Sequence, residues 1–164
     1  MAAYDVPEWT DLFVATTGAA AALAGLVFVA VSINIERILK FEGLAERALE
    51  TVLTLSVVVL VSIACLIPGQ SVAVLGIELL LVGGGYSAFV LRLWPHTRPG
   101  RDDPLTWLLS HVLLRLIAAV PLLVGAISLI AESGGGLYWI VAGIVGAIIS
   151  SVANAWVLLV EILR

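Results

Sequence analysis

Five long apolar runs, separated by short polar segments, constrain this sequence more than any other feature. The runs cover approximately residues 9–34, 45–67, 71–93, 104–131 and 137–163. Each is long enough for a transmembrane α-helix, which needs about 20 apolar residues. Hydrophobic residues make up 62% of the chain and charged residues 12%, whereas soluble domains carry roughly 45–50% and about 25%. The sequence therefore predicts an all-α, polytopic membrane protein, with a single five-helix domain over residues 1–164.

The basic residues predict the orientation of this bundle. Seven of the eight Lys and Arg residues fall in alternate connections or at the C-terminus: Arg37, Lys40, Arg47, Arg92, Arg98, Arg101 and Arg164. The other side carries acidic residues only: Asp5, Glu8, Asp11 and Glu132. Because short cytoplasmic loops are enriched in Lys and Arg, we expect the N-terminus outside and the C-terminus in the cytoplasm.

Several classes of function lack the residues that they need. The net charge of −4 gives no reason to expect nucleic-acid binding. The single cysteine, Cys65, excludes an intrachain disulfide, and His96 and His111 lie in different segments without a metal-ligand spacing. Cys65 lies near the outer end of its helix and should not meet His111 in the inner half. We therefore expect no enzyme, no metal and no cofactor.

Three ionisable side chains lie within predicted spans and away from the charged segments at their ends, where they are costly and often functional: Glu78, His111 and Arg115. Counted from Pro104, Arg115 lies roughly 16 Å into its helix, near mid-bilayer. His111 is one turn earlier on the same face, so that face should point inward. Arg115 could tie helices together, line a hydrated path or anion site, or extend to lipid headgroups. For His111, a hydrogen bond between helices competes with a place on such a path.

Glu78 is the intramembrane carboxylate that we consider as a partner for Arg115. It lies roughly 10 Å below the outer surface, at about 1.5 Å per residue. Arg115 lies roughly 14 Å below that surface if the hydrocarbon core is about 30 Å thick. The two side chains lean in opposite directions, however, since helical side chains point toward the N-terminus of their own helix. The pair therefore stays one alternative.

The segment from Glu36 to Glu50 mixes acidic and basic residues. We predict a solvated helical extension at the cytoplasmic surface, with Glu50 among its charges. A docking surface for a cytoplasmic partner is the alternative.

Small and polar residues share one face of the last predicted helix, since they are spaced by four, three and four residues. They are Gly143, Ala147, Ser150 and Asn154. The last two lie in the inner half of the bilayer, at a depth similar to that of His111, Thr51 and Thr54. These residues could form one polar layer open toward the cytoplasm. Ordinary hydrogen bonding and close packing between helices is the alternative.

The first helix carries a second stripe of small residues, which includes Gly18, Ala22 and Gly25. Stripes of this kind allow helices to approach closely within membranes. We predict helix packing at this stripe, either against another helix of the chain or against another protomer.

One part of the sequence resembles a known group of proteins. The stretch from Phe13 to Leu39, FVATTGAAAALAGLVFVAVSINIERIL, resembles the first helix of small, uncharacterised multi-pass bacterial membrane proteins. Some of them are labelled modulators of a membrane-bound AAA protease. The resemblance implies a location in the bacterial inner membrane, and no catalytic residue comes with it.

These observations support two functional hypotheses. The first is a homo-oligomeric channel or permeation protein, with a polar path near His111, Arg115, Ser150 and Asn154. The alternative is a non-enzymatic modulator or partner subunit of a membrane complex, which would use the cytoplasmic loops and the stripe of the first helix. In both, the lipid bilayer surrounds the chain, and the sequence identifies no other protein partner.

Overall fold

The described part of the chain consists of helices and the turns between them. The computed structural model describes residues 2–41, 43–93 and 113–163, and these ranges contain no strand. The elements are η1 (Ala2–Tyr4), η2 (Val6–Trp9), α1 (Thr10–Ile33), α2 (Ile35–Ile38), α3 (Leu44–Cys65), α4 (Val72–Leu93), α6 (Leu114–Ile130) and α7 (Leu137–Leu163).

Within the described ranges, four helices are long and apolar enough to cross a membrane. The apolar spans are Val6–Ile33, Leu44–Cys65, Val72–Arg92 and Leu137–Val160. The described part of α6 is also apolar but has 17 residues, and the predicted start of this helix at residue 104 lies outside the described residues. Elsewhere the helix ends agree with the predicted ones to within two residues. The chain thus has the helices of a multi-pass membrane protein, and the fifth crossing stays a prediction.

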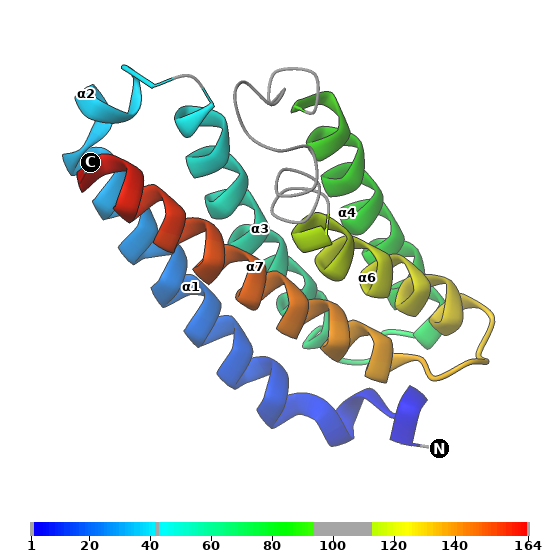
Figure 1. Ribbon diagram of the computed structural model, residues 1–164. Coiled ribbons are helices and arrows are strands. Elements are labelled where there is room, and N and C mark those ends of the chain that lie inside the picture. The colour runs from blue at the N-terminus through cyan, green and yellow to red at the C-terminus, as the bar shows by residue number, and fades with distance from the viewer. Residues whose placement is uncertain (1, 42, 94–112, 164) are drawn as a thin grey trace.

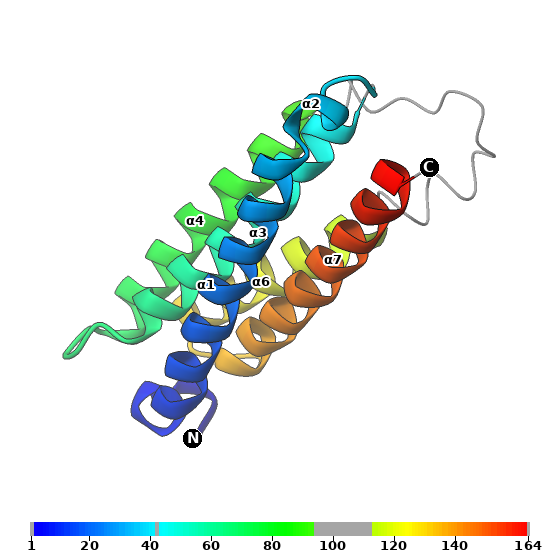
Figure 2. The ribbon, with the colours of Figure 1, turned by 90° about the vertical axis from the view of Figure 1, so that its left-hand side faces the viewer.

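The long helices lie side by side, with their ends at two opposite faces of the molecule (Figures 1 and 2). One face, here called the basic end, holds α2, the start of α3 and the ends of α4 and α7. Among the described residues, the basic residues at this end are Arg37, Lys40, Arg47 and Arg92. The opposite face, the acidic end, holds the N-terminal turns and the α3–α4 and α6–α7 turns. Among the described residues, the Lys and Arg of the predicted basic side therefore lie at one end, while Arg98, Arg101 and Arg164 lie outside the described residues. The cytoplasmic location of the basic end stays a prediction.

Glycines allow α6 to approach both of its neighbours closely. A Cβ atom at Gly143 of α7 would lie 2.7 Å from Leu122 of α6, and one at Gly76 of α4 would lie 2.7 Å from Ile130. These distances are shorter than ordinary carbon–carbon contacts of about 3.5–4.0 Å, so a side chain at either position would force part of α6 to shift. Ala147 is also buried on α7. Gly143 thus lies at a close contact between α6 and α7, and Ala147 lies inside the bundle.

The N-terminal turns anchor the start of α1 at the acidic end. The Tyr4 hydroxyl accepts a hydrogen bond of 3.0 Å from the amide of Gly135, in the α6–α7 turn. Trp9 packs edge-on against Tyr138, with ring centroids 4.9 Å apart. These contacts connect η1 to the α6–α7 turn and η2 to the first turn of α7.

Candidate functional site: a buried ion pair between helices

Glu50 of α3 and Arg115 of α6 form a buried, bidentate ion pair. Arg115 Nε donates to Glu50 Oε1 at 2.7 Å, and Arg115 Nη2 donates to Glu50 Oε2 at 2.6 Å. Each residue is only 6% exposed. Two parallel, charge-assisted hydrogen bonds are among the strongest polar contacts that proteins make. The pair joins α3 to α6 and balances both charges within the bundle.

The position of Glu50 corrects the prediction of a solvated segment from Glu36 to Glu50. Since α3 begins at Leu44, Glu50 lies in its second turn, with its side chain inside the bundle. Buried residues recur along α3 every three or four positions, and Glu50 is part of that series: Glu50, Thr54, Val57, Val58, Val61, Ser62 and Cys65. The sequence pattern could therefore have indicated that Glu50 is buried. The helical period assigns Glu50 to the buried face, although its neighbours in sequence are charged.

Two hydroxyl groups extend the site toward α4. Thr54 Oγ1 donates to the Glu50 carbonyl oxygen at 2.7 Å, and the Tyr86 hydroxyl lies 2.8 Å from Thr54 Oγ1. A threonine hydroxyl has one proton, and Thr54 uses it on the carbonyl oxygen, so Tyr86 is the donor to Thr54. Within one turn, α3 thus contacts α6 through charges and α4 through hydroxyls.

Arg115 faces inward, as predicted, and ties two helices together through a carboxylate. Its guanidinium binds Glu50 inside the bundle, which excludes an extension to lipid headgroups. Arg115 lies roughly 22 Å from the end of α6 at Ile130, at about 1.5 Å per residue. This places it nearer the basic end than the predicted mid-bilayer depth, which was counted from Pro104, outside the described residues. His111 also lies outside them, so its predicted roles stay predictions.

Glu78 lies at a different level of the bundle. It is half-buried on α4, two residues from Gly76, which packs against Ile130 at the far end of α6. Arg115 is fifteen residues before Ile130, and its carboxylate partner is Glu50. The alternative of a Glu78–Arg115 pair is therefore wrong. Glu78 and Arg115 lie about three to four helical turns apart along the bundle, at about 5.4 Å per turn, which is too far for their side chains to meet.

Ser150 and Asn154 are both buried on α7. The helices α6 and α7 are antiparallel, and a Cβ at Gly146 of α7 would collide with the Ile117 carbonyl of α6. One turn after Gly146, Ser150 is therefore level with the start of α6, where Arg115 lies. Asn154 follows one turn closer to the basic end. The structure thus brings Ser150 to the level of the ion pair, and a role for either residue in permeation stays a proposal.

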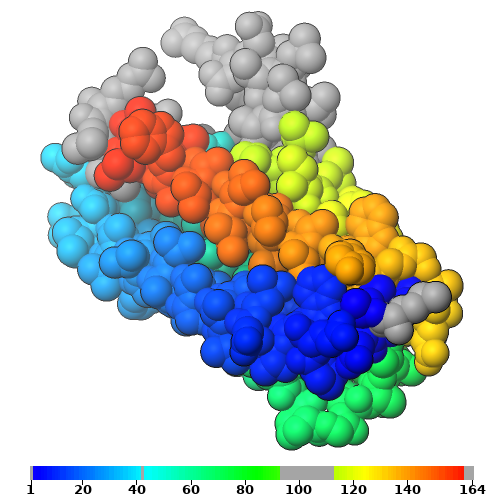
Figure 3. All heavy atoms as spheres, turned by 90° about the horizontal axis from the view of Figure 1, so that it is seen from below, coloured from blue at the N-terminus to red at the C-terminus, as the bar shows by residue number. Residues whose placement is uncertain are grey.

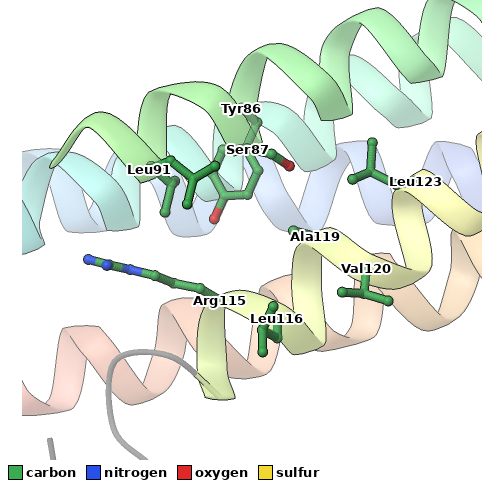
Figure 4. A pocket seen from close by; sticks show the side chains of 9 residues that line it. Tyr86, Ser87, Leu91, Arg115, Leu116, Ala119, Val120 and Leu123 are labelled. Carbon is green, nitrogen blue, oxygen red and sulfur yellow. The ribbon is translucent and has the colours of Figure 1, made fainter. Parts of the chain in front are cut away.

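A cavity of about 190 Å³ lies beside Arg115, between α4 and α6 (Figure 4). We call it the α4–α6 groove. Its lining consists of Tyr86, Ser87, Val90, Leu91, Arg115, Leu116, Ala119, Val120 and Leu123. The polar ends of Tyr86 and Arg115 are bonded to α3, so the groove itself is largely apolar. Apolar cavities of this size stay dry, so the groove is unsuited to a water path.

The small-residue stripe of α1 faces away from the described remainder of the chain. Gly18, Ala22 and Gly25 are exposed, and a Cβ at either glycine would meet no atom within 4 Å. Only 11% of the apolar span that contains α1 is buried, against 50% for α3. In Figure 3, α1 (blue) lies uncovered across the face that is shown. Packing of this stripe against another described helix of the chain is therefore excluded; α1 packs on α3, and its buried residues are Phe13 and Ala20.

Comparisons with known proteins give no information about this site, so its chemistry is inferred from its own residues. The chain matches no protein-family model, no curated protein and no solved structure. Within the described ranges, no group of three or more His, Cys, Asp or Glu residues could hold a metal ion. Both oxygens of the Glu50 carboxylate already accept hydrogen bonds from Arg115. The geometry therefore supports charge neutralisation and the tethering of helices as the chemistry of the site.

Proposed function

We propose that this chain is a non-enzymatic subunit of a membrane assembly and that the α1 stripe, Gly18, Ala22 and Gly25, is its assembly surface. The observation that carries the proposal is a contrast between glycines. At Gly76 and Gly143, a neighbouring helix fills the space that a side chain would occupy, whereas this space is open at Gly18 and Gly25. The chain thus uses glycine for close helix contact internally and presents the same feature on an outer face.

In a bilayer, the α1 stripe is suited to pack against another transmembrane helix. Lipid tails are as apolar as leucine, so helices associate in membranes through close packing, which small residues permit. The two glycines lie on one face of α1, two turns apart. The ion pair and the internal glycine contacts hold α3, α4, α6 and α7 together without this face. It is therefore available to a partner without loss of internal contacts.

The occupant that we favour is a second copy of this chain, packed α1 against α1. As part of the same proposal, the chain lies in a bacterial inner membrane, which the resemblance of the first helix implies. The basic end then faces the cytoplasm. A different membrane protein on this face would make the chain a modulator subunit. The mass of the assembly separates these two cases.

The test is the mass of the purified protein in mild detergent, measured by light scattering for three proteins. Wild type should have the mass of more than one chain, and Gly25→Leu should reduce it to a single chain. Gly85→Leu is the matched control, because Gly85 of α4 is also exposed with open space around it but lies outside the stripe. Circular dichroism checks that each variant stays helical. A wild-type protein that is a single chain, both in detergent and after cross-linking in the membrane, would contradict the proposal.

A second candidate function, permeation through a homo-oligomer, draws on the shared level of Ser150 and Arg115. A buried charge and a buried hydroxyl at one depth are what a polar path through the bundle of each protomer would need. Arg115→Leu and His111→Ala should then alter flux in proteoliposomes. Unchanged flux in both variants would remove this candidate.

A further inference from the structure

We propose that the α4–α6 groove binds one acyl chain of a membrane phospholipid. This site is separate from the α1 stripe and does not depend on the proposed assembly.

The groove results from the way in which α4 and α6 diverge. At the acidic end, a Cβ at Gly76 would lie 2.7 Å from Ile130, and nearer the middle a Cβ at Gly83 would lie 3.5 Å from Leu123. Beyond this point, two small side chains, Ser87 and Ala119, line the space between the helices. They leave the cavity of about 190 Å³ that Figure 4 shows.

The rim of the groove belongs to the outer surface of the helices. Leu91, Leu116 and Val120 line it and are also exposed. In a bilayer, this surface faces hydrocarbon. If the α4–α6 groove were empty, the side chains of both walls would lose dispersion contacts. Water is an unfavourable occupant because the lining is apolar. A cavity of about 150 Å³ already accommodates benzene, so this one is large enough for a segment of an acyl chain.

The charges near the groove indicate how the lipid is oriented. The groove begins at Leu91, and the next residue, Arg92, is exposed in the last turn of α4 at the basic end. A cation near the membrane surface attracts anionic headgroups, so we place the phosphate level with Arg92. The guanidinium of Arg115 is bound to Glu50, and Arg115 therefore contributes its aliphatic stem to the wall. The acyl chain then extends from Leu91 toward Leu123.

The test uses wild-type protein in vesicles that contain a phospholipid with a photoactivatable diazirine in one acyl chain. After irradiation, mass spectrometry of the peptides locates the labelled residues. We expect labelling to be concentrated several-fold at residues 86–91 and 115–123, relative to the exposed face of α7 around Ile149. Equal labelling of the groove and the Ile149 face would overturn the proposal, because it would indicate ordinary lipid contact only.

Two variants fill the groove from opposite walls: Ala119→Phe on α6 and Ser87→Leu on α4. Each should lower labelling of the groove to the level at Ile149, and thermal unfolding checks that each is folded. Ile149→Phe is the control and should leave the groove labelled as in wild type. If Ala119→Phe does not fold, Ser87→Leu alone decides the result. Unchanged labelling in a folded groove variant, or a cross-link from the groove to a second copy of the chain in place of lipid, would refute an acyl-chain site.

Discussion

Removing one partner of the Glu50–Arg115 pair should destabilise the protein far more than removing both. The two residues are each 6% exposed and share hydrogen bonds of 2.7 and 2.6 Å. Glu50→Leu removes the carboxylate to which the buried guanidinium donates two hydrogen bonds, and Arg115→Met removes the cation that binds the buried carboxylate. Removal of one member of a buried pair usually lowers the free energy of unfolding by about 3–5 kcal/mol. Replacement of both by apolar residues is often neutral, or stabilising by about 1–4 kcal/mol.

The assay is the free energy of unfolding of wild type, both single variants and the double variant. It is measured by circular dichroism in mixed micelles with increasing sodium dodecyl sulfate. The losses of the single variants should sum to about 6–10 kcal/mol, while the double variant stays close to wild type. Glu78→Gln, a carboxylate change outside the pair, should alter the stability by about 1 kcal/mol or less. A double variant whose loss equals the sum of the two single losses would refute the reasoning, because independent sites add.

The remaining predictions concern packing and the hydroxyl pair, and the same unfolding assay measures them. Gly146→Ala should destabilise the fold by about 1–3 kcal/mol, because its Cβ would collide with the Ile117 carbonyl. Gly85→Ala, in open space and outside the α1 stripe, should instead stabilise α4 by about 1 kcal/mol or less; equal effects at both glycines would contradict the packing. Tyr86→Phe should cost about 0.5–1.5 kcal/mol, because it removes the hydrogen bond that Thr54 accepts. No loss in Tyr86→Phe would mean that this hydroxyl pair does not stabilise α3 against α4.

The helix ends were largely predictable from the sequence. A helix must match the thickness of the hydrocarbon core, and Pro68-Gly69 and the Glu132–Gly136 turn interrupt the pattern at defined places. The inward direction of Arg115 was also predictable, because a charge exposed to lipid is costly. Its partner was missed because Glu50 was grouped with the charges around it in sequence. A count of its position along the buried face of α3 would have selected it.

The side of α1 that carries Gly18 and Gly25 could not be oriented from the sequence. In a soluble protein, the polar face of a helix identifies the exposed side. In a membrane protein, the face toward lipid and the face toward other helices are both apolar. Small residues indicate that a close contact is possible and leave the neighbour undefined. The α7 stripe and the α1 stripe therefore looked alike, and the structure places Gly143 against α6 and Gly25 in open space.

The polar groups of the bundle also limit how a partner could recognise α1. The charges of Glu50 and Arg115 are bound to each other, and the hydroxyls of Thr16 and Ser32 on α1 donate to carbonyl oxygens of their own helix at 2.7 and 2.8 Å. With these donors occupied, polar contacts can add little specificity to an α1 interface, and specificity must come from shape. A helix with glycines on one face provides this, because the backbone of a partner can approach more closely there than at any leucine or phenylalanine. For this reason, Gly25→Leu tests assembly more directly than a substitution that removes a hydroxyl from α1.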